Sequence, residues 1–215
     1  MKKILLLAAA LLAAAPSSAT PPAAPGPLLQ GGASDAAWRP LFAQLTLHTP
    51  VFSRFAEERV FPFRERPVVL EGEMRYDPDR GLSLRYTQPE ERILIVDAGG
   101  MLQRDHQGRT RTMPADPHAT ALNAALSAML RFDPAEIDRA FTVRGARDGD
   151  DWRLDLQPRD AALARLLGTF TAEGRGGELL RLEFRRSAKQ RVTIRITEAH
   201  RDVVFDAATL QRFFR

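Results

Sequence analysis

Residues 70–86 read LEGEMRYDPDRGLSLRY. Leu70, Met74 and Tyr76 alternate with charged residues, and the same period of two resumes after the turn. Because successive side chains of a strand point to opposite faces, each half predicts a strand with one apolar and one charged face. Residues 77–81 carry the proline and glycine typical of a tight reversal. The stretch therefore predicts an antiparallel hairpin.

The two-residue period recurs along most of the chain. One large curved antiparallel sheet and a two-sheet sandwich would both show it, so the period alone leaves these architectures open. Pro62 favours an edge position or a bulge for the first strand, because proline has no N–H to donate to a neighbour. The predicted strands are residues 55–63, 70–77, 82–87, 93–96, 101–106, 109–113, 152–157, 180–185 and 191–197.

Helical spacing is confined to three places. Residues 36–47 predict an amphipathic helix after Asp35, and residues 118–140 predict a pair of helices, the second starting at Asp133. Residues 202–215 predict a short C-terminal helix. If the first two groups form a removable lid, the apolar side of the sheet is a lipid site, and if they are permanently docked it is a core. The sequence alone favours the core.

The first 19 residues have the pattern of a secretory signal peptide. Lys2 and Lys3 precede an apolar run that Pro16 ends, too short for the roughly 20 residues that cross a membrane. Cleavage is expected after Ala19. We expect residues 20–34, rich in proline, alanine and glycine, to form a flexible tether, and residues 35–215 to fold as one domain outside the cytoplasm, in the periplasm.

Composition narrows the function further. The chain has no cysteine, so we expect neither disulfides nor lipid attachment to a cysteine. Losing two lysines with the signal peptide lowers the formal charge from +4 to +2 (4 − 2). The arginines are dispersed along the chain, which argues against nucleic-acid binding and mildly favours contact with anionic surfaces.

Catalytic patterns are missing from the sequence. His48, His106, His118 and His200 have no metal-ligand spacing, and no serine lies in a Gly-x-Ser-x-Gly elbow. Residues 148–151 resemble a calcium loop only superficially and predict a hairpin turn. We therefore expect no enzyme activity, no metal and no cofactor.

Several of these features occur in an order that resembles a known family. Gly72-Glu73-Met74, the turn at residues 77–81, Gln88-Pro89-Glu90-Glu91 and the aliphatic residues 93–96 before Asp97 and a glycine pair resemble LolA-type periplasmic lipoprotein carriers. The resemblance extends more loosely to about residue 198. It implies an incomplete antiparallel barrel of about eleven strands, mainly β, closed by a helical lid over a hydrophobic cavity.

The resemblance also implies a function. Such carriers take acylated cargo from an inner-membrane export complex and deliver it to an outer-membrane acceptor, without covalent chemistry. Each CH₂ shielded from water contributes roughly 0.8 kcal/mol to holding an acyl chain. We expect a monomer that carries a lipoprotein or a related lipid. The alternatives are a LolA-like paralogue for a glycolipid or fatty-acyl product, and a lipid-sensing periplasmic interaction protein.

The candidate site residues are the apolar and aromatic side chains expected to line the cavity. The family's turn arginine, which helps to hold the lid shut, aligns with Pro78. Arg80 lies two positions later and is either a lid contact or a surface residue of the turn. The expected cavity residues are Met74, Tyr76, Leu84, Tyr86, Ile95, Leu126, Met129, Trp152, Leu154, Leu182, Phe184 and Ile194.

Overall fold

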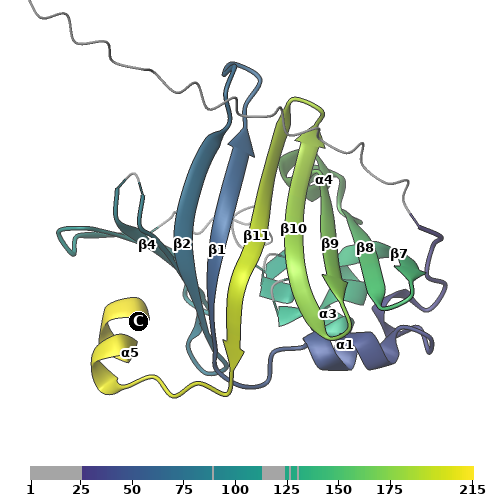
Figure 1. Cartoon of the computed structure of the whole chain (residues 1–215), viewed down its shortest axis with the longest axis horizontal. Helices are drawn as coiled ribbons and strands as arrows, with labels where there is room; N and C mark the ends of the chain where they lie inside the picture. The colour runs from purple at the N-terminus through teal and green to yellow at the C-terminus, as the bar shows by residue number, and fades with distance from the viewer. Residues whose placement is uncertain (1–25, 89, 113–123, 126, 130) are drawn as a thin grey trace, which may run out of the picture.

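The computed structural model describes residues 26–88, 90–112, 124–125, 127–129 and 131–215. Its eleven strands form one antiparallel sheet in the order β6-β5-β4-β3-β2-β1-β11-β10-β9-β8-β7, which is open between β6 and β7 (Figure 1). The predicted incomplete barrel is therefore confirmed over the sandwich. The strands are β1 (Val51–Val60), β2 (Val68–Asp77), β3 (Gly81–Tyr86), β4 (Arg92–Asp97), β5 (Gly100–Asp105), β6 (Thr110–Thr112), β7 (Phe141–Asp148), β8 (Asp151–Pro158), β9 (Thr169–Arg175), β10 (Glu178–Ser187) and β11 (Gln190–Arg201).

The predicted hairpin in residues 70–86 is confirmed as β2–β3. Tyr76 pairs with Leu82, and Asp77 pairs with Gly81. The Asp77 carboxylate accepts backbone N–H bonds from Asp79 at 3.0 Å and Arg80 at 3.1 Å, which fixes the turn. Gly81 has φ +89°, a conformation that other residues rarely adopt.

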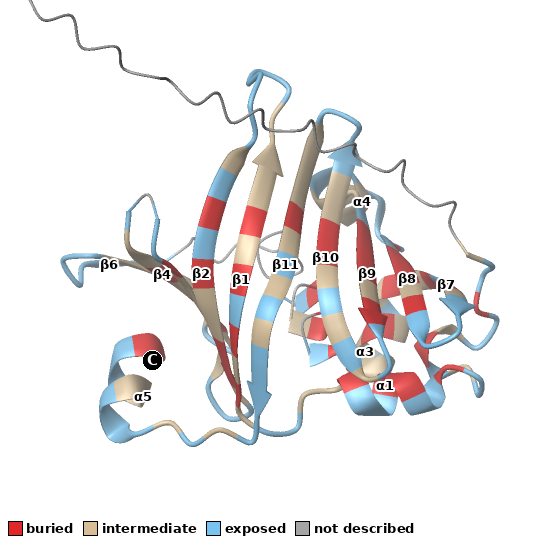
Figure 2. Ribbon diagram, in the orientation of Figure 1, coloured by how far each residue is buried: buried red, intermediate tan, exposed pale blue. Residues whose placement is uncertain are grey.

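The short helices are η1 (Gly32–Ser34), α1 (Arg39–Leu45), α3 (Pro134–Ala140), α4 (Ala161–Leu167) and α5 (Ala207–Phe213). The sheet curves around α1 and α3 (Figure 1). We call the side that these two helices cover the lid face, and the opposite side the outer face. The largest core among the described residues lies on the lid face, where α1, α3, Ala125, Met129 and Phe132 pack against β7–β10 (Figure 2).

Close packing of α1 depends on a glycine in β7. A Cβ atom at Gly145 would lie 2.5 Å from Cζ2 of the Trp38 indole. Trp38 is buried with Phe42 and Leu45 of α1. The missing side chain in β7 therefore makes room for the tryptophan that anchors the helix.

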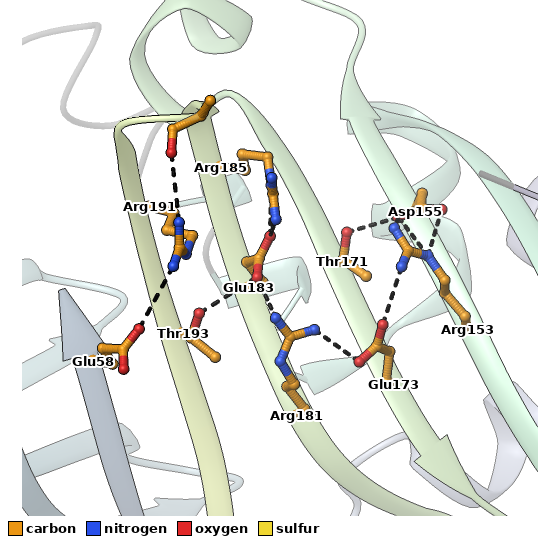
Figure 3. Close-up of polar contacts among 11 residues, drawn as sticks. Glu58, Arg153, Asp155, Thr171, Glu173, Arg181, Glu183, Arg185, Arg191 and Thr193 are labelled. Atoms are coloured by element: carbon orange, nitrogen blue, oxygen red, sulfur yellow. Dashed lines mark hydrogen bonds and ion pairs between the residues drawn. The ribbon is translucent and has the colours of Figure 1, made fainter. Parts of the chain in front are cut away.

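The outer face of β8–β11 carries a chain of ion pairs (Figure 3). Glu173 joins Arg153 at 3.1 Å to Arg181 at 2.8 Å, so its carboxylate bridges two strands. Arg181 also pairs with Glu183, which is buried and accepts from Arg185 Nε at 2.7 Å. Charged side chains on neighbouring strands thus neutralise one another, which explains why every second residue of these strands can be charged on the outer face.

The outer face of β4 is apolar instead, together with Leu102 of β5, and α5 covers it. Ile93 and Ile95 of β4 pack against Phe213 and Phe214 at the end of α5. The guanidinium of Arg75 lies 3.8 Å from the centroid of the Phe213 ring, a cation–π contact. The predicted C-terminal helix is confirmed, and it shields this half of the outer face.

Several predicted boundaries were wrong. The helix predicted at residues 36–47 is shorter, and the first strand runs from Val51 to Val60 at the centre of the sheet, paired with β2 and β11. Pro62 lies in the turn beyond that strand, so it marks neither an edge nor a bulge; the register shift lies between Arg54 and Phe55. Among the described residues, no helix has the length and apolar character needed to span a membrane.

Candidate functional site

A cavity of about 320 Å³ opens on the lid face between the central strands and the end of α1. Such a volume is at the low end of the range typical of small-molecule sites. Leu180, 44% exposed, gives the cavity an accessible apolar wall. The lining residues are Leu45, Leu47, Val51, Ser53, Met74, Phe132, Gly177, Glu178, Leu179, Leu180, Leu182, Ile196, Thr197, Glu198, Ala199 and Arg201.

Few polar groups enter this cavity from the sheet. Ser53 of β1 is buried, and its Oγ has no hydrogen-bond partner among the described residues. Arg201, at the end of β11, lies opposite Val51 and lines the cavity, whereas Glu198 lies opposite Arg54 in the outer-face phase, where His200 Nε2 and Arg54 Nη1 engage its carboxylate, each at 2.6 Å. These contacts, His200 first, lower the pKa of Glu198 and keep it ionised. The cavity therefore combines an apolar interior with charged residues on β11.

An apolar wall continues along the lid face from this cavity towards the β1–β2 hairpin. Phe55, Leu70 and Tyr86 form a buried cluster against which Met74 and Ile196, two cavity residues, also pack. The rings of Phe55 and Tyr86 meet edge to face at a centroid distance of 5.6 Å. The wall offers an unbroken apolar strip along the strands.

The strip ends in a cluster of polar side chains. Glu57 is only 2% exposed, accepts the Tyr86 hydroxyl at 2.9 Å and pairs with Arg59. Arg59 and Arg92 lie over the Tyr86 ring, with Cζ 5.6 Å and 4.7 Å from its centroid. Arg92 makes no ion pair with any described residue. The cluster of Glu57, Arg59, Tyr86 and Arg92 thus holds two guanidinium groups and one carboxylate.

Burial and the neighbouring charges change the pKa values of Tyr86 and Arg59 in this cluster. Removal of the Tyr86 phenol from water, followed by repulsion from the Glu57 carboxylate, raises the pKa of Tyr86 strongly. Burial opposes the charged form of Arg59, but the hydrogen bond to Glu57, the charge of Glu57 and the contact with Tyr86 together outweigh this and raise the pKa of Arg59. At neutral pH the phenol is therefore a hydrogen-bond donor and the arginine is charged.

Residues 131–132 are fastened to the end of α1. The Thr46 hydroxyl donates to the Phe132 carbonyl at 2.8 Å, and the Leu47 N–H donates to the Arg131 carbonyl at 3.1 Å. Tyr76 of β2 in turn donates to the Leu47 carbonyl at 3.3 Å. These few hydrogen bonds link the helical layer to the sheet beside the cavity.

The family of the chain follows from a sequence comparison. The family model described as outer membrane lipoprotein carrier protein LolA-like matches residues 30–213. The chain belongs to this LolA-like family. A comparison with curated proteins gave no match.

Solved structures similar to this LolA-like chain share little sequence with it. An outer membrane lipoprotein-sorting protein domain from Vibrio parahaemolyticus gives a TM-score of 0.43 at 6% identity, over 79% of this chain and 92% of that one. A LolA superfamily protein from Nitrosomonas europaea gives 0.43 at 7% identity, over 80% and 96%. The Pseudomonas aeruginosa MucA/MucB complex gives 0.44 at 15% identity, over 81% of this chain and 59% of the matched chain.

Most of the predicted cavity residues of this LolA-like protein lie on the lid face. Met74 and Leu182 line the cavity itself. Leu126 lies outside the described residues. The others on the lid face pack in the clusters around the cavity and under the helices, and they are Tyr76, Leu84, Tyr86, Met129, Trp152, Leu154, Phe184 and Ile194.

Ile95 was assigned to the wrong face. In β4 it lies opposite Ser83, whereas Leu94 lies opposite Leu84, and Ile95 packs under α5 on the outer face. The error arose because α5 covers the outer face there, so both phases of the run Ile93-Leu94-Ile95-Val96 are apolar. Periodicity does not distinguish the two faces of such a strand.

Arg80 also differs from the expectation of a lid contact. Its Nη1 donates to the carbonyl of Arg215 at 3.2 Å, so its hydrogen bond is to the C-terminus. It does border a second cavity, of about 290 Å³, together with Ser127 and Arg131 of the helical layer. The C-terminal segment therefore takes the place of the lid as the partner of this arginine.

Sequence reasoning missed the polar cluster. In β1, Glu57 and Arg59 occupy the same phase as Val51 and Phe55, so they point to the lid face. The sequence did contain a signal for the cluster, because Glu57 and Arg59 are charged residues at positions where the alternation of β1 calls for apolar ones. The strand was predicted to start too late for this phase to stand out.

Proposed function

We propose that this LolA-like protein binds the acyl chains of a lipoprotein or a related lipid on the lid face and carries them through the periplasm from the inner to the outer membrane. The observation that carries the proposal is the apolar cavity between the central strands and α1, with its accessible wall at Leu180. Each CH₂ that enters it contributes roughly 0.8 kcal/mol to binding.

The shape of the lid face suits an amphiphile. An acyl chain in the cavity can extend along the apolar strip of Phe55 and Met74, and a polar head can lie near Arg59 and Arg92. Separation of the helical layer from the sheet would expose side chains that are now buried, such as Phe42, Met129 and Phe132, so the acyl chains of the cargo would have to replace their contacts. A larger volume would then become available for the cargo.

The test is uptake of a fluorescent fatty-acyl probe by Leu180→Glu. Leu180 is partly exposed, so this change puts a carboxylate into the cavity wall without disturbing the core. We expect affinity to fall by about tenfold or more, because the added charge must be desolvated against the chain. Val204→Glu is the matched control, since Val204 is 95% exposed outside the cavity. Equal binding by both variants would contradict a binding site in this cavity.

A further inference from the structure

Two neighbouring hairpins form a projecting rim at one end of the sheet. Residues 61–67 connect β1 to β2, and residues 188–189 connect β10 to β11. Val60 pairs with Arg191, and Glu58 forms an ion pair with Arg191 at 3.8 Å, so the two tips lie side by side (Figure 1). α4 adjoins them, because Gly168 at its end contacts the backbone of residues 185–186.

This rim exposes aromatic and aliphatic side chains. Phe61 and Phe63 stack with their ring centroids 5.3 Å apart, and Phe63 is 78% exposed. Val69, at the start of β2, is 64% exposed, and Leu166 of α4 is exposed as well. Large apolar side chains that project together from a tip are costly in water unless another apolar phase receives them.

The same rim carries positive charge without matching acids. Arg64, Arg66, Arg186 and Lys189 are exposed and form no ion pair with a described residue, and Glu65 is the one exposed acid among them. Other arginines here are neutralised: Arg59 by Glu57, Arg185 by Glu183 and Arg191 by Glu58. Four unmatched cations against one carboxylate leave the rim positive.

We propose that this rim docks on an anionic lipid bilayer. Basic side chains around exposed aromatic rings match a bilayer surface, where cations meet lipid phosphates and the rings enter the interface. The two tips project beyond the rest of the sheet (Figure 1), an arrangement that favours contact with a flat lipid surface over binding of a protein partner. This docking would bring the Glu57, Arg59, Tyr86 and Arg92 cluster, which lies on the same end of β1, towards the membrane.

The experiment is co-sedimentation of residues 20–215, which contain every described residue, with vesicles. The vesicles are phosphatidylethanolamine and phosphatidylglycerol in equal amounts, or phosphatidylcholine alone, at low and high salt. We expect binding to the anionic vesicles that weakens with salt, and little to the neutral ones. Failure to bind the anionic vesicles would overturn the proposal and leave an acidic protein as the partner to seek.

Variants separate the two contributions. The double variant Phe61→Ser with Phe63→Ser should weaken vesicle binding by about tenfold or more. The double variant Arg64→Glu with Arg66→Glu should weaken it by about fivefold or more for each cation removed. The controls are Val204→Ser, in the segment between β11 and α5, and Arg39→Glu, in α1; these elements lie at the end of the sheet opposite the rim (Figure 1), so the changes should alter binding less than about twofold. Equal losses in the controls would show that the rim is not the contact.

A spectroscopic readout tests insertion directly. Phe63→Trp adds an exposed indole, whereas Trp38 and Trp152 are buried and report little on the surface. We expect its emission to shift to shorter wavelength on anionic vesicles. An unchanged emission in vesicle-bound protein would contradict insertion of the tip. Because acyl-probe uptake plays no part in these measurements, they can fail while the proposed carrier function stands.

Discussion

Replacing Tyr86 with phenylalanine tests how strongly the polar cluster on the lid face is coupled. The change removes the hydroxyl that donates to Glu57 at 2.9 Å and leaves the ring that packs on Phe55. Glu57 keeps Arg59 on its other oxygen. The perturbation therefore removes a hydrogen bond to a carboxylate that is almost wholly buried, together with the longer bond of 3.3 Å that the hydroxyl accepts from Arg59 Nη2.

The magnitude follows from the charge of the acceptor. A hydrogen bond to a charged group contributes about 1.5–3 kcal/mol, and a buried oxygen left without a donor incurs the cost of its desolvation. We expect Tyr86→Phe to lower the free energy of unfolding by about 2 kcal/mol. Tyr76→Phe is the matched control, since Tyr76 donates to the neutral Leu47 carbonyl at the longer distance of 3.3 Å. It should cost about 0.5–1 kcal/mol.

The assay is urea denaturation of both variants, analysed with the wild-type dependence on denaturant. Glu57→Gln and the double variant with Tyr86→Phe complete a cycle that gives the coupling energy between the two side chains. A cost for Tyr86→Phe no greater than that for Tyr76→Phe would show that the bond to the buried Glu57 carboxylate stabilises the fold no more than a bond to a neutral carbonyl. A coupling energy near zero would do the same.

Three further predictions concern packing and pH. Gly145→Ala should destabilise the fold by about 1–3 kcal/mol in thermal unfolding, and by less when Trp38→Phe relieves the clash; an equal loss in both backgrounds would exclude this contact as the cause. Burial raises the pKa of both Tyr76 and Tyr86, so absorbance titration of the folded protein should show less phenolate at pH 10 than the unfolded protein, whose tyrosines ionise near that pH; equal amounts would contradict the burial of these phenols. Burial opposes the charged form of Glu73, yet hydrogen bonds from two arginines lower its pKa, so its ionised form contributes stability that is present above pH 4.5 and is lost as the pH falls further. Glu73→Gln should therefore make the free energy of unfolding less dependent on pH below 4.5, and an unchanged dependence would contradict this role of Glu73.

The sequence predicted most strands because one face of the sheet is apolar and the other charged. The hairpin in residues 70–86 has the predicted phase, and Asp133 begins α3 by accepting N–H bonds from Ala135 and Glu136. Phase assignment failed at Ile95, where α5 covers the second face. That cover comes from the far end of the chain, so no local pattern contains it.

The strands β7 and β9 were missed for a related reason. Their lid-face positions include Gly145, Ala172 and Gly174, small residues that give little apolar signal. Gly145 accommodates Trp38 from α1, and Gly174 accommodates Trp152 from β8. The small residues make sense only once the two tryptophans are in place. The polar cluster was missed because its members come from β1, β3 and β4, which only the folded sheet brings together.

The proposed carrier function is tested by native mass spectrometry of the protein purified from its own cells, with extraction of any bound lipid. We expect a bound acylated species, whose mass would distinguish a lipoprotein from a glycolipid or a fatty-acyl product. An empty protein that also fails to take up a fluorescent fatty-acyl probe would contradict the account, and the lid face would then be only the core of the fold.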